Sequence, residues 1–168
     1  MNIKTKKIVM ASLFAAICCV VTMVIQIPSP FKGYINIGDS IVLLAGWLLS
    51  PLYGFLAAGI GSAFADLFSG YVIYAPITFL IKGIMAVNAY YAFRILNKAC
   101  GKTASYIVSG VGSEIIMIVG YFLFDGIVYG FAPSLANIPA GVIQGVSGLI
   151  LGVVLVKTRV ARITEINA

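Results

Sequence analysis

The chain has 168 residues, of which 61% are hydrophobic and only 10% are charged, whereas an average soluble domain has about 25% charged residues. Its mean hydropathy is +1.09, and eleven Lys and Arg against five Asp and Glu give a net charge of +6. This composition excludes a soluble globular domain, because so small a number of polar side chains cannot cover a surface that faces water. It indicates an all-α integral membrane protein with four to six spanning helices of about 20 residues each.

The chain contains no histidine and three cysteines. Without histidine, His-dependent catalytic triads, most zinc sites and haem ligation are excluded. Residues Gly145-Val146-Ser147-Gly148 match the Gly-x-Ser-Gly motif of intramembrane rhomboid proteases, but that serine needs a His partner to activate it. No glycine-rich phosphate loop is present either. We therefore expect no enzyme, no bound metal and no cofactor in this chain, and any ATP hydrolysis has to come from partner subunits.

Runs with at most one charged residue predict the membrane spans, and their bounds are residues 8–27, 40–65, 67–93, 103–124 and 126–156. The second run contains Pro51. Splitting it at Ser50-Pro51 gives a compact six-helix bundle, and leaving it whole gives five spans. Residues 39–69 reach about 46 Å as helix, whereas two full crossings need about 60 Å. The split therefore predicts a short second helix near residues 39–49, covered by its neighbours.

The basic residues form three clusters, one before the first run, one in mid-chain and one in the tail: Lys4, Lys6 and Lys7; Arg94, Lys98 and Lys102; Lys157, Arg159 and Arg162. The positive-inside rule places all three in the cytoplasm. An even number of spans must then precede Arg94, which favours six helices with both termini cytoplasmic. Five spans with the tail outside is the alternative. Loops 27–38, 68–74 and 125–137 then lie outside the cell.

Three predicted helices carry small residues at 4-3-4 spacing, which keeps them on one helix face. The three stripes are Ala11, Ala15, Cys18 and Thr22; Gly54, Ala58, Gly61 and Ala65; Gly141, Gly145, Gly148 and Gly152. Small residues let helices approach closely in lipid. We expect the second and third stripes to pack within the bundle. The first stripe either packs internally or faces a separate membrane partner.

Ionisable residues inside spans are costly and therefore point to function. Lys82 and Asp66 lie near the same external turn and are expected to pair. Glu114 lies near the midplane, where a side chain reaches water least easily. Asn88 and Gln144 are further buried polar candidates, and Asn88 is interpreted as a bridge between helices. The external loops are rich in aromatic residues, which predicts either an interfacial belt or a lidded pocket for a flat ring compound.

Several stretches together resemble the substrate-binding S components of energy-coupling factor (ECF) vitamin transporters. They are residues 33–40 (GYINIGDS), 50–54 (SPLYG) and 59–66 (GIGSAFAD), followed by Ser69-Gly70-Tyr71, Tyr74-Ala75-Pro76 and Lys82-Gly83. The resemblance covers most of residues 8–155 and is nearest to the hydroxymethylpyrimidine or pyridoxine branch. It implies six helices, cytoplasmic ends and an external pocket capped by the first and third loops.

The same resemblance implies partners. Residues Ala11 and Ala15 look like the family's Ala-x-x-x-Ala contact to a membrane coupling subunit, which works with two cytoplasmic ATPase subunits. We therefore expect residues 1–168 to form a single transmembrane substrate-binding domain in a prokaryotic cell membrane, within an ABC-type importer. It would capture hydroxymethylpyrimidine or pyridoxine. The alternatives are another vitamin such as riboflavin, or a small oligomeric channel or secondary carrier. The predicted substrate-binding residues are Tyr34, Asn36, Asp39, Asp66, Tyr74, Lys82, Glu114, Tyr121 and Gln144.

Overall fold

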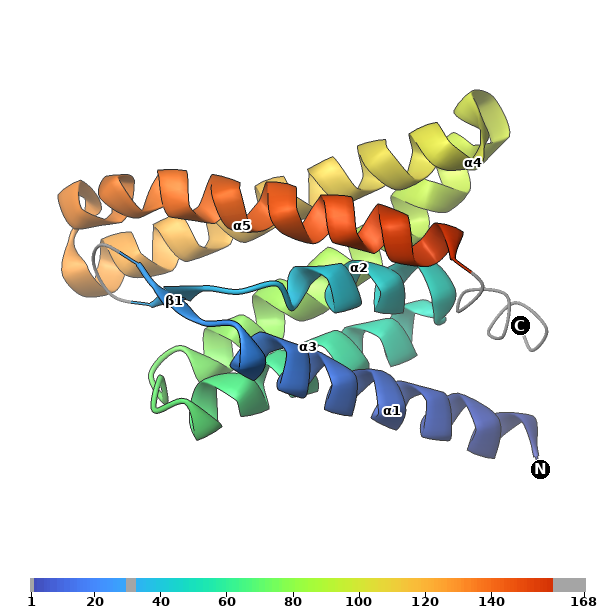
Figure 1. The fold of residues 1–168 in the computed structure, drawn as a ribbon, viewed down its shortest axis with the longest axis horizontal. Helices are drawn as coiled ribbons and strands as arrows, with labels where there is room; N and C mark the ends of the chain where they lie inside the picture. Colours follow the sequence, from blue (N-terminus) through green and yellow to red (C-terminus); the bar gives the residue numbers. More distant parts are fainter. Residues whose placement is uncertain (1, 30–32, 159–168) are drawn as a thin grey trace.

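The computed structural model describes residues 2–29 and 33–158, which form a helical bundle with one short antiparallel ribbon (Figure 1). The elements are α1 (Ile3–Val24), β1 (Ile27–Pro28), β2 (Tyr34–Ile35), α2 (Asp39–Leu48), α3 (Pro51–Phe68), α4 (Ala75–Tyr129) and α5 (Phe131–Lys157). The ribbon pairs Ile27 with Ile35 and Pro28 with Tyr34, and it joins α1 to α2. The predicted all-α class is confirmed. Arg159 and Arg162 of the predicted tail cluster lie outside the described residues.

The predicted six-helix count is not reproduced, because five helices are assigned in the described residues and the fourth and fifth predicted spans form one element, α4, of 55 residues. This element is not straight. Gly101 has φ 74° and ψ 164°, a backbone region that is essentially open to glycine alone. The chain reverses there, so that residues 75–100 and residues 102–129 form two arms that run back along each other (Figure 1).

The split at Pro51 is confirmed, and so is the short second helix. Helix α2 ends at Leu48, and α3 begins at Pro51, where proline suits the first helical turn because no backbone donor is needed there. Helices α1, α3, α4 and α5 are long and apolar enough to cross a membrane, whereas the 10 residues of α2 reach only about 15 Å. The surrounding helices α3, α4 and α5 bury α2 almost completely, which makes a short helix tolerable at membrane depth.

The glycine stripe of α5 packs inside the bundle, as predicted. A Cβ atom at Gly148 would lie 2.7 Å from Cβ of Asp39, and one at Gly145 would lie 3.1 Å from Cβ of Glu114. Because real Cβ atoms need more room than this, glycine at these positions brings α5 close to α2 and to the second arm of α4. The stripe of α3 does the same, since a Cβ at Gly54 would lie 3.0 Å from the Ala45 carbonyl oxygen of α2.

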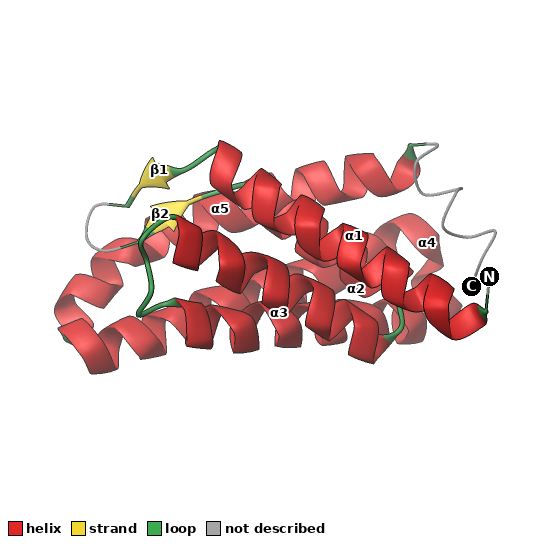
Figure 2. Ribbon diagram, turned by 90° about the horizontal axis from the view of Figure 1, so that it is seen from below, coloured by secondary structure: helices red, strands yellow, loops and turns green. Residues whose placement is uncertain are grey.

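The stripe of α1 also faces inward, toward α3. The contact of Ala11 and Ala15 with a partner subunit stays a prediction. Helices α1 and α3 lie side by side (Figure 2). Ala11 is 8% exposed and Cys18 only 1%, and Gly61 of α3 faces the Ala15 carbonyl and Cys18. The stripe therefore serves close packing within the chain. A neighbouring face of α1, which includes Ser12 and Ala16, is exposed.

Candidate functional site

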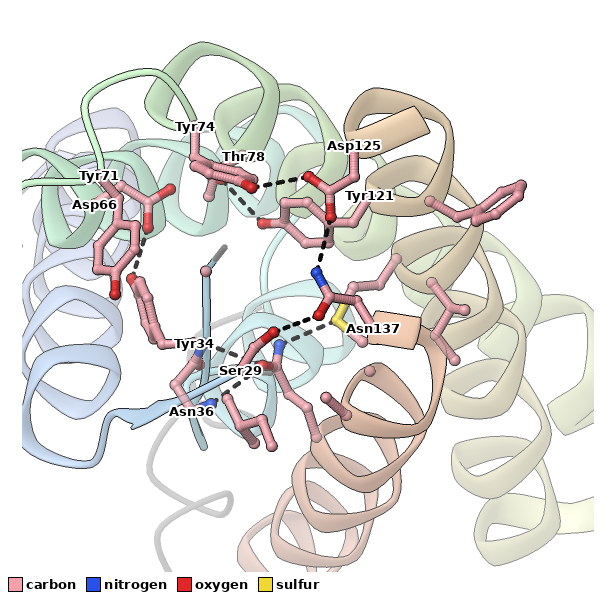
Figure 3. Close-up of a pocket in the computed structure, with 18 of the residues that line it drawn as sticks. Ser29, Tyr34, Asn36, Asp66, Tyr71, Tyr74, Thr78, Tyr121, Asp125 and Asn137 are labelled. Atoms are coloured by element: carbon pink, nitrogen blue, oxygen red, sulfur yellow. Dashed lines mark hydrogen bonds between the residues drawn. The ribbon is translucent and has the colours of Figure 1, made fainter. Parts of the chain in front are cut away.

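A cavity, called the ribbon cavity below, opens at the end of the bundle that holds the β1–β2 ribbon (Figure 3). Its walls come from the end of α1, the ribbon, α3, both arms of α4 and α5. It measures about 830 Å³ when counted out to its open mouth, a volume that includes open solvent. Residues far apart in the sequence thus converge on one space, and most of them come from the predicted external loops or the adjoining helix ends.

Tyrosine rings form one side of the ribbon cavity. Tyr34 and Tyr71 have ring centroids 4.8 Å apart, and Tyr71 and Tyr74 have centroids 6.3 Å apart. Tyr121 and Phe122 line the same space from the second arm of α4. The four tyrosine rings border the interior of the cavity (Figure 3), so they present flat apolar surface to a ligand rather than forming only a belt at the membrane interface.

Each of three tyrosine hydroxyls has a fixed partner. Tyr34 donates to Asp66 Oδ1 at 2.6 Å, Tyr74 donates to Asp125 Oδ1 at 2.9 Å, and Tyr121 shares a hydrogen bond of 3.0 Å with Thr78. Burial and the neighbouring Asp66 carboxylate raise the pKa of Tyr34, and burial and Asp125 do the same for the pKa of Tyr74. Both hydroxyls are therefore protonated donors at neutral pH.

A chain of buried polar side chains forms the floor. The Gln144 Nε2 donates to Asp39 Oδ2 at 2.8 Å, and its Oε1 accepts from the Asn36 backbone at 3.1 Å and from Asn36 Nδ2 at 3.3 Å. Lys82 pairs with Asp39 Oδ1, and its Nζ lies 3.2 Å from Met117 Sδ. The floor therefore ties the ribbon loop, α2, α4 and α5 together, and it matches a buried charge with a buried counter-charge.

A second set of hydrogen bonds closes the rim. Ser29 donates to Asn137 Oδ1 at 2.6 Å, and Asn137 Nδ2 lies 3.4 Å from Asp125 Oδ2. These contacts link the ribbon to α5 and α5 to the second arm of α4 (Figure 3). Ser29, Thr78 and Asn137 were not predicted. The one available signal was their position within or next to the predicted external loops, since the spacing of neutral polar residues alone does not single them out.

Seven of the nine predicted binding residues line the ribbon cavity, and they are Tyr34, Asn36, Asp66, Tyr74, Lys82, Tyr121 and Gln144. Asp39 and Glu114 do not. Asp39 lies behind Lys82 and Gln144 as their partner. Glu114 is 5% exposed and faces Gly145, and neither of its carboxylate oxygens has a hydrogen-bond partner among the described residues. The expected pairing of Lys82 with Asp66 is wrong. Lys82 pairs with Asp39 instead, because the ribbon directs the chain back into the bundle and α2 therefore begins beside Lys82.

Asn88 acts as the predicted bridge between helices. Its Nδ2 donates to Ser113 Oγ at 3.0 Å, which joins the two arms of α4 at a point away from the cavity lining. In the part of the chain that the structure describes, no group of three or more His, Cys, Asp or Glu side chains is placed to hold a metal ion.

Comparisons with known proteins agree with this architecture. A family model described as "ECF-type riboflavin transporter, S component" matches residues 2–161. An uncharacterized protein from Pyrococcus woesei, described as lying in a gap 3′ region, is 34% identical over 134 residues, which cover 79% of this chain and 87% of that protein. A solved structure described under "Structure and mechanism of the S component of a bacterial ECF transporter" has a TM-score of 0.68. It is 19% identical and covers 96% of this chain and 99% of that chain, a likeness that shows a shared fold.

Proposed function

The chain belongs to the family of ECF-type riboflavin transporter S components, and from this premise we propose that it captures riboflavin in the ribbon cavity and delivers it inward. Members of this family are substrate-binding membrane components for vitamin uptake and not enzymes, and this chain is a multi-pass protein of the plasma membrane. Residues 1–168 would act as one binding domain.

The observation that carries the riboflavin proposal is the pairing of a tyrosine wall with a floor and rim of amides and carboxylates. Riboflavin offers a flat three-ring face for stacking, ring carbonyl and N–H groups, and a side chain of hydroxyls. Tyr71 and Tyr74 supply ring faces, while Asn36, Asn137 and Gln144 each supply both donors and acceptors.

Equilibrium titration of the purified chain tests the substrate. We expect riboflavin to bind with one-to-one stoichiometry, and pyridoxine and hydroxymethylpyrimidine to bind at least about 100-fold more weakly, a difference of about 2.7 kcal/mol. Quenching of flavin fluorescence reports the first ligand, and displacement of riboflavin reports the other two. The reverse ranking would assign the chain to the pyridoxine or hydroxymethylpyrimidine branch. Failure of all three vitamins to bind would overturn the capture of these vitamins altogether.

We further propose six crossings with both termini in the cytoplasm. The reversal at Gly101 gives two arms of about 26 and 28 residues, each about 40 Å long and sufficient to cross a bilayer. The N-terminus and this reversal lie at one end of the bundle, and the ribbon lies at the other (Figure 1). Cys100 is exposed next to the reversal. In intact cells a membrane-impermeant thiol reagent should label Val72→Cys at the ribbon end, but not the native Cys100. Labelling of both would contradict this topology.

We propose that transport requires a membrane coupling subunit and two ATPase subunits, as S components of this family work. Because Ala11 and Ala15 pack against α3, the coupling subunit would dock on the exposed face of α1. Ala16→Trp should then abolish transport and preserve riboflavin binding, whereas Ala15→Trp, its matched control on the inner face, should disrupt folding and lose both. ATP-independent transport by the chain alone would instead indicate a channel or secondary carrier.

A further inference from the structure

A second cavity, called the basic cavity below, lies at the end of the bundle opposite the ribbon. It is bounded by the first turns of α1, the α2–α3 junction and the reversal of α4. The N-terminus and the α4 reversal mark this end in Figure 1. Counted to its mouth, the basic cavity measures about 1250 Å³, compared with about 830 Å³ for the ribbon cavity. Riboflavin capture does not use this space.

The rim of the basic cavity is cationic. Lys6, Lys7, Arg94 and Lys102 line it, and no acidic residue of the described chain does. The Arg94 guanidinium lies over the Tyr90 ring, 4.3 Å from its centroid. Such stacking holds the planar group in a defined position. Guanidinium and ammonium groups arranged in this way favour a phosphate, which accepts several charge-assisted hydrogen bonds at once.

The floor of the basic cavity consists of packed aromatic rings. Phe93 and Tyr106 stack with centroids 4.3 Å apart and an interplanar angle of 16°, and Trp47 meets Tyr106 edge-on at 4.9 Å. The Trp47 Nε1 donates to Ser109 Oγ at 3.0 Å, which uses the one donor of the indole. The floor therefore offers an apolar surface directly beneath the cationic rim.

We propose that the basic cavity binds the headgroup of an anionic phospholipid, with the phosphate at Arg94 and the neighbouring lysines and the first hydrocarbon groups against the aromatic floor. Basic pockets between transmembrane helices bind such headgroups. A soluble phosphate ester shares the phosphate chemistry but would leave the aromatic floor uncovered. The neighbouring faces of α1 and α4 carry exposed Ile8, Val9 and Ile95, which suit the acyl chains.

The chain contains its own reporter for this site, because Trp47 is the single tryptophan of the sequence and is 7% exposed in the floor of the basic cavity. The full chain is placed in phosphatidylcholine nanodiscs that contain either brominated phosphatidylglycerol or brominated phosphatidylcholine. We expect the brominated phosphatidylglycerol to quench Trp47 at mole fractions about tenfold lower, because only the anionic headgroup draws the lipid into the cavity.

Two triple variants with the same change in charge provide the test. Lys7→Gln/Arg94→Gln/Lys102→Gln should abolish the preference for phosphatidylglycerol. Lys4→Gln/Lys98→Gln/Lys157→Gln, at exposed residues outside the cavity lining, should keep the preference within about twofold, since general attraction to the membrane depends on total charge. Circular dichroism checks that each variant is folded, and Arg94→Gln alone should lower the preference if the pocket triple does not fold.

Three results would overturn the proposal. Equal loss of the preference in both triples would mean diffuse attraction without a site. Equal quenching by the two brominated lipids would mean that the headgroup is not recognised. Removal of the phosphatidylglycerol preference by millimolar glycerol 3-phosphate, with no effect of the same concentration of sulfate, would identify a soluble phosphate ester as the ligand in place of the lipid.

Discussion

The two ends of the bundle differ in how they handle charge. Four acidic residues lie in the described chain, and all of them lie in or directly behind the ribbon cavity, where tyrosines, amides and Lys82 surround them. The basic cavity has four cations and no described acid in its lining. The acidic side chains therefore gather at one end of the bundle, where hydrogen bonds and Lys82 hold several of them, and the described lining of the other end is cationic. Directed hydrogen-bonding groups favour a ligand that matches them in position, whereas a cationic lining favours an anionic ligand.

The largest expected effect comes from breaking the internal charge pair behind the ribbon cavity. Lys82 and Asp39 are both almost completely buried, so Asp39→Asn leaves a buried cation without its counter-charge and should cost about 3–5 kcal/mol of stability. Asp39→Asn/Lys82→Met removes both charges and should recover most of that loss. Thermal unfolding followed by fluorescence-detected size exclusion measures both. A double variant as unstable as the single one would mean that the pair is not the source of the stability.

A smaller effect is expected from removing one hydroxyl in the ribbon cavity. Tyr34→Phe deletes the donor to Asp66 Oδ1, and Asp66 Oδ2 already has no hydrogen-bond partner among the described residues. Leaving this buried carboxylate less satisfied should lower the free energy of unfolding by about 1–3 kcal/mol, and loss of the bond that orients the Tyr34 ring should weaken riboflavin binding. The matched control is Tyr53→Phe in the basic cavity, which should leave riboflavin affinity unchanged. Equal losses in the two variants would erase the distinction between the ends.

Glu114 is expected to contribute little to ligand affinity, although it is a buried acid. It does not line the ribbon cavity, and within residues 2–29 and 33–158 its carboxylate oxygens have no hydrogen-bond partner to lose. Glu114→Gln should therefore bind riboflavin within about twofold of the wild-type affinity. Gln144→Glu is the contrasting change, because it removes the donor to Asp39 Oδ2 and places two carboxylates together. Isothermal titration of both variants separates the roles, and a large loss in Glu114→Gln would move this residue into the site.

The smallest effect is expected from pH. Burial beside Asp66 and Asp125 raises the pKa of Tyr34 and of Tyr74 above the ordinary value near 10. A raised pKa means that both hydroxyls keep their protons as the pH rises from 7 to 9, so riboflavin affinity should change by less than about twofold. Titrations at pH 7, 8 and 9 check this. A loss of affinity centred below pH 9 would show that a different group controls binding.

Much of the fold follows from the sequence because lipid imposes simple rules. Pro51 predicts the break between α2 and α3, and the 4-3-4 spacing of the α5 glycines predicts close packing. The rotation of α1 about its own axis, which decides the face that packs against α3, does not follow from the sequence. Ala11 and Ala15 form one small-residue pair and Ser12 and Ala16 another, about 100° apart around the helix, and spacing alone cannot decide which pair faces α3.

The sequence indicated which residues line the candidate site better than it indicated which of them bond to one another. The rule that buried polar residues in apolar spans are costly without a role selected Lys82 and Gln144, and both line the ribbon cavity. The same reasoning could not predict which carboxylate pairs with Lys82. Asp39 begins α2 and Asp66 lies near the end of α3. The choice between them depends on the ribbon, whose two-residue strands are too short to leave a periodic signal.

The hydrogen bond between Ser29 and Asn137 has a kinetic consequence. It fastens the ribbon to α5 across the mouth of the ribbon cavity, with Asn137 held in turn near Asp125. A ligand that enters between the ribbon and α5 has to part these side chains before it reaches the tyrosines, so on that route encounter alone does not produce a complex. The association rate should therefore lie well below the diffusion limit of about 10⁹ M⁻¹s⁻¹. Once this hydrogen bond re-forms after the ligand has entered, it slows dissociation. The dissociation rate, more than the association rate, then sets the affinity.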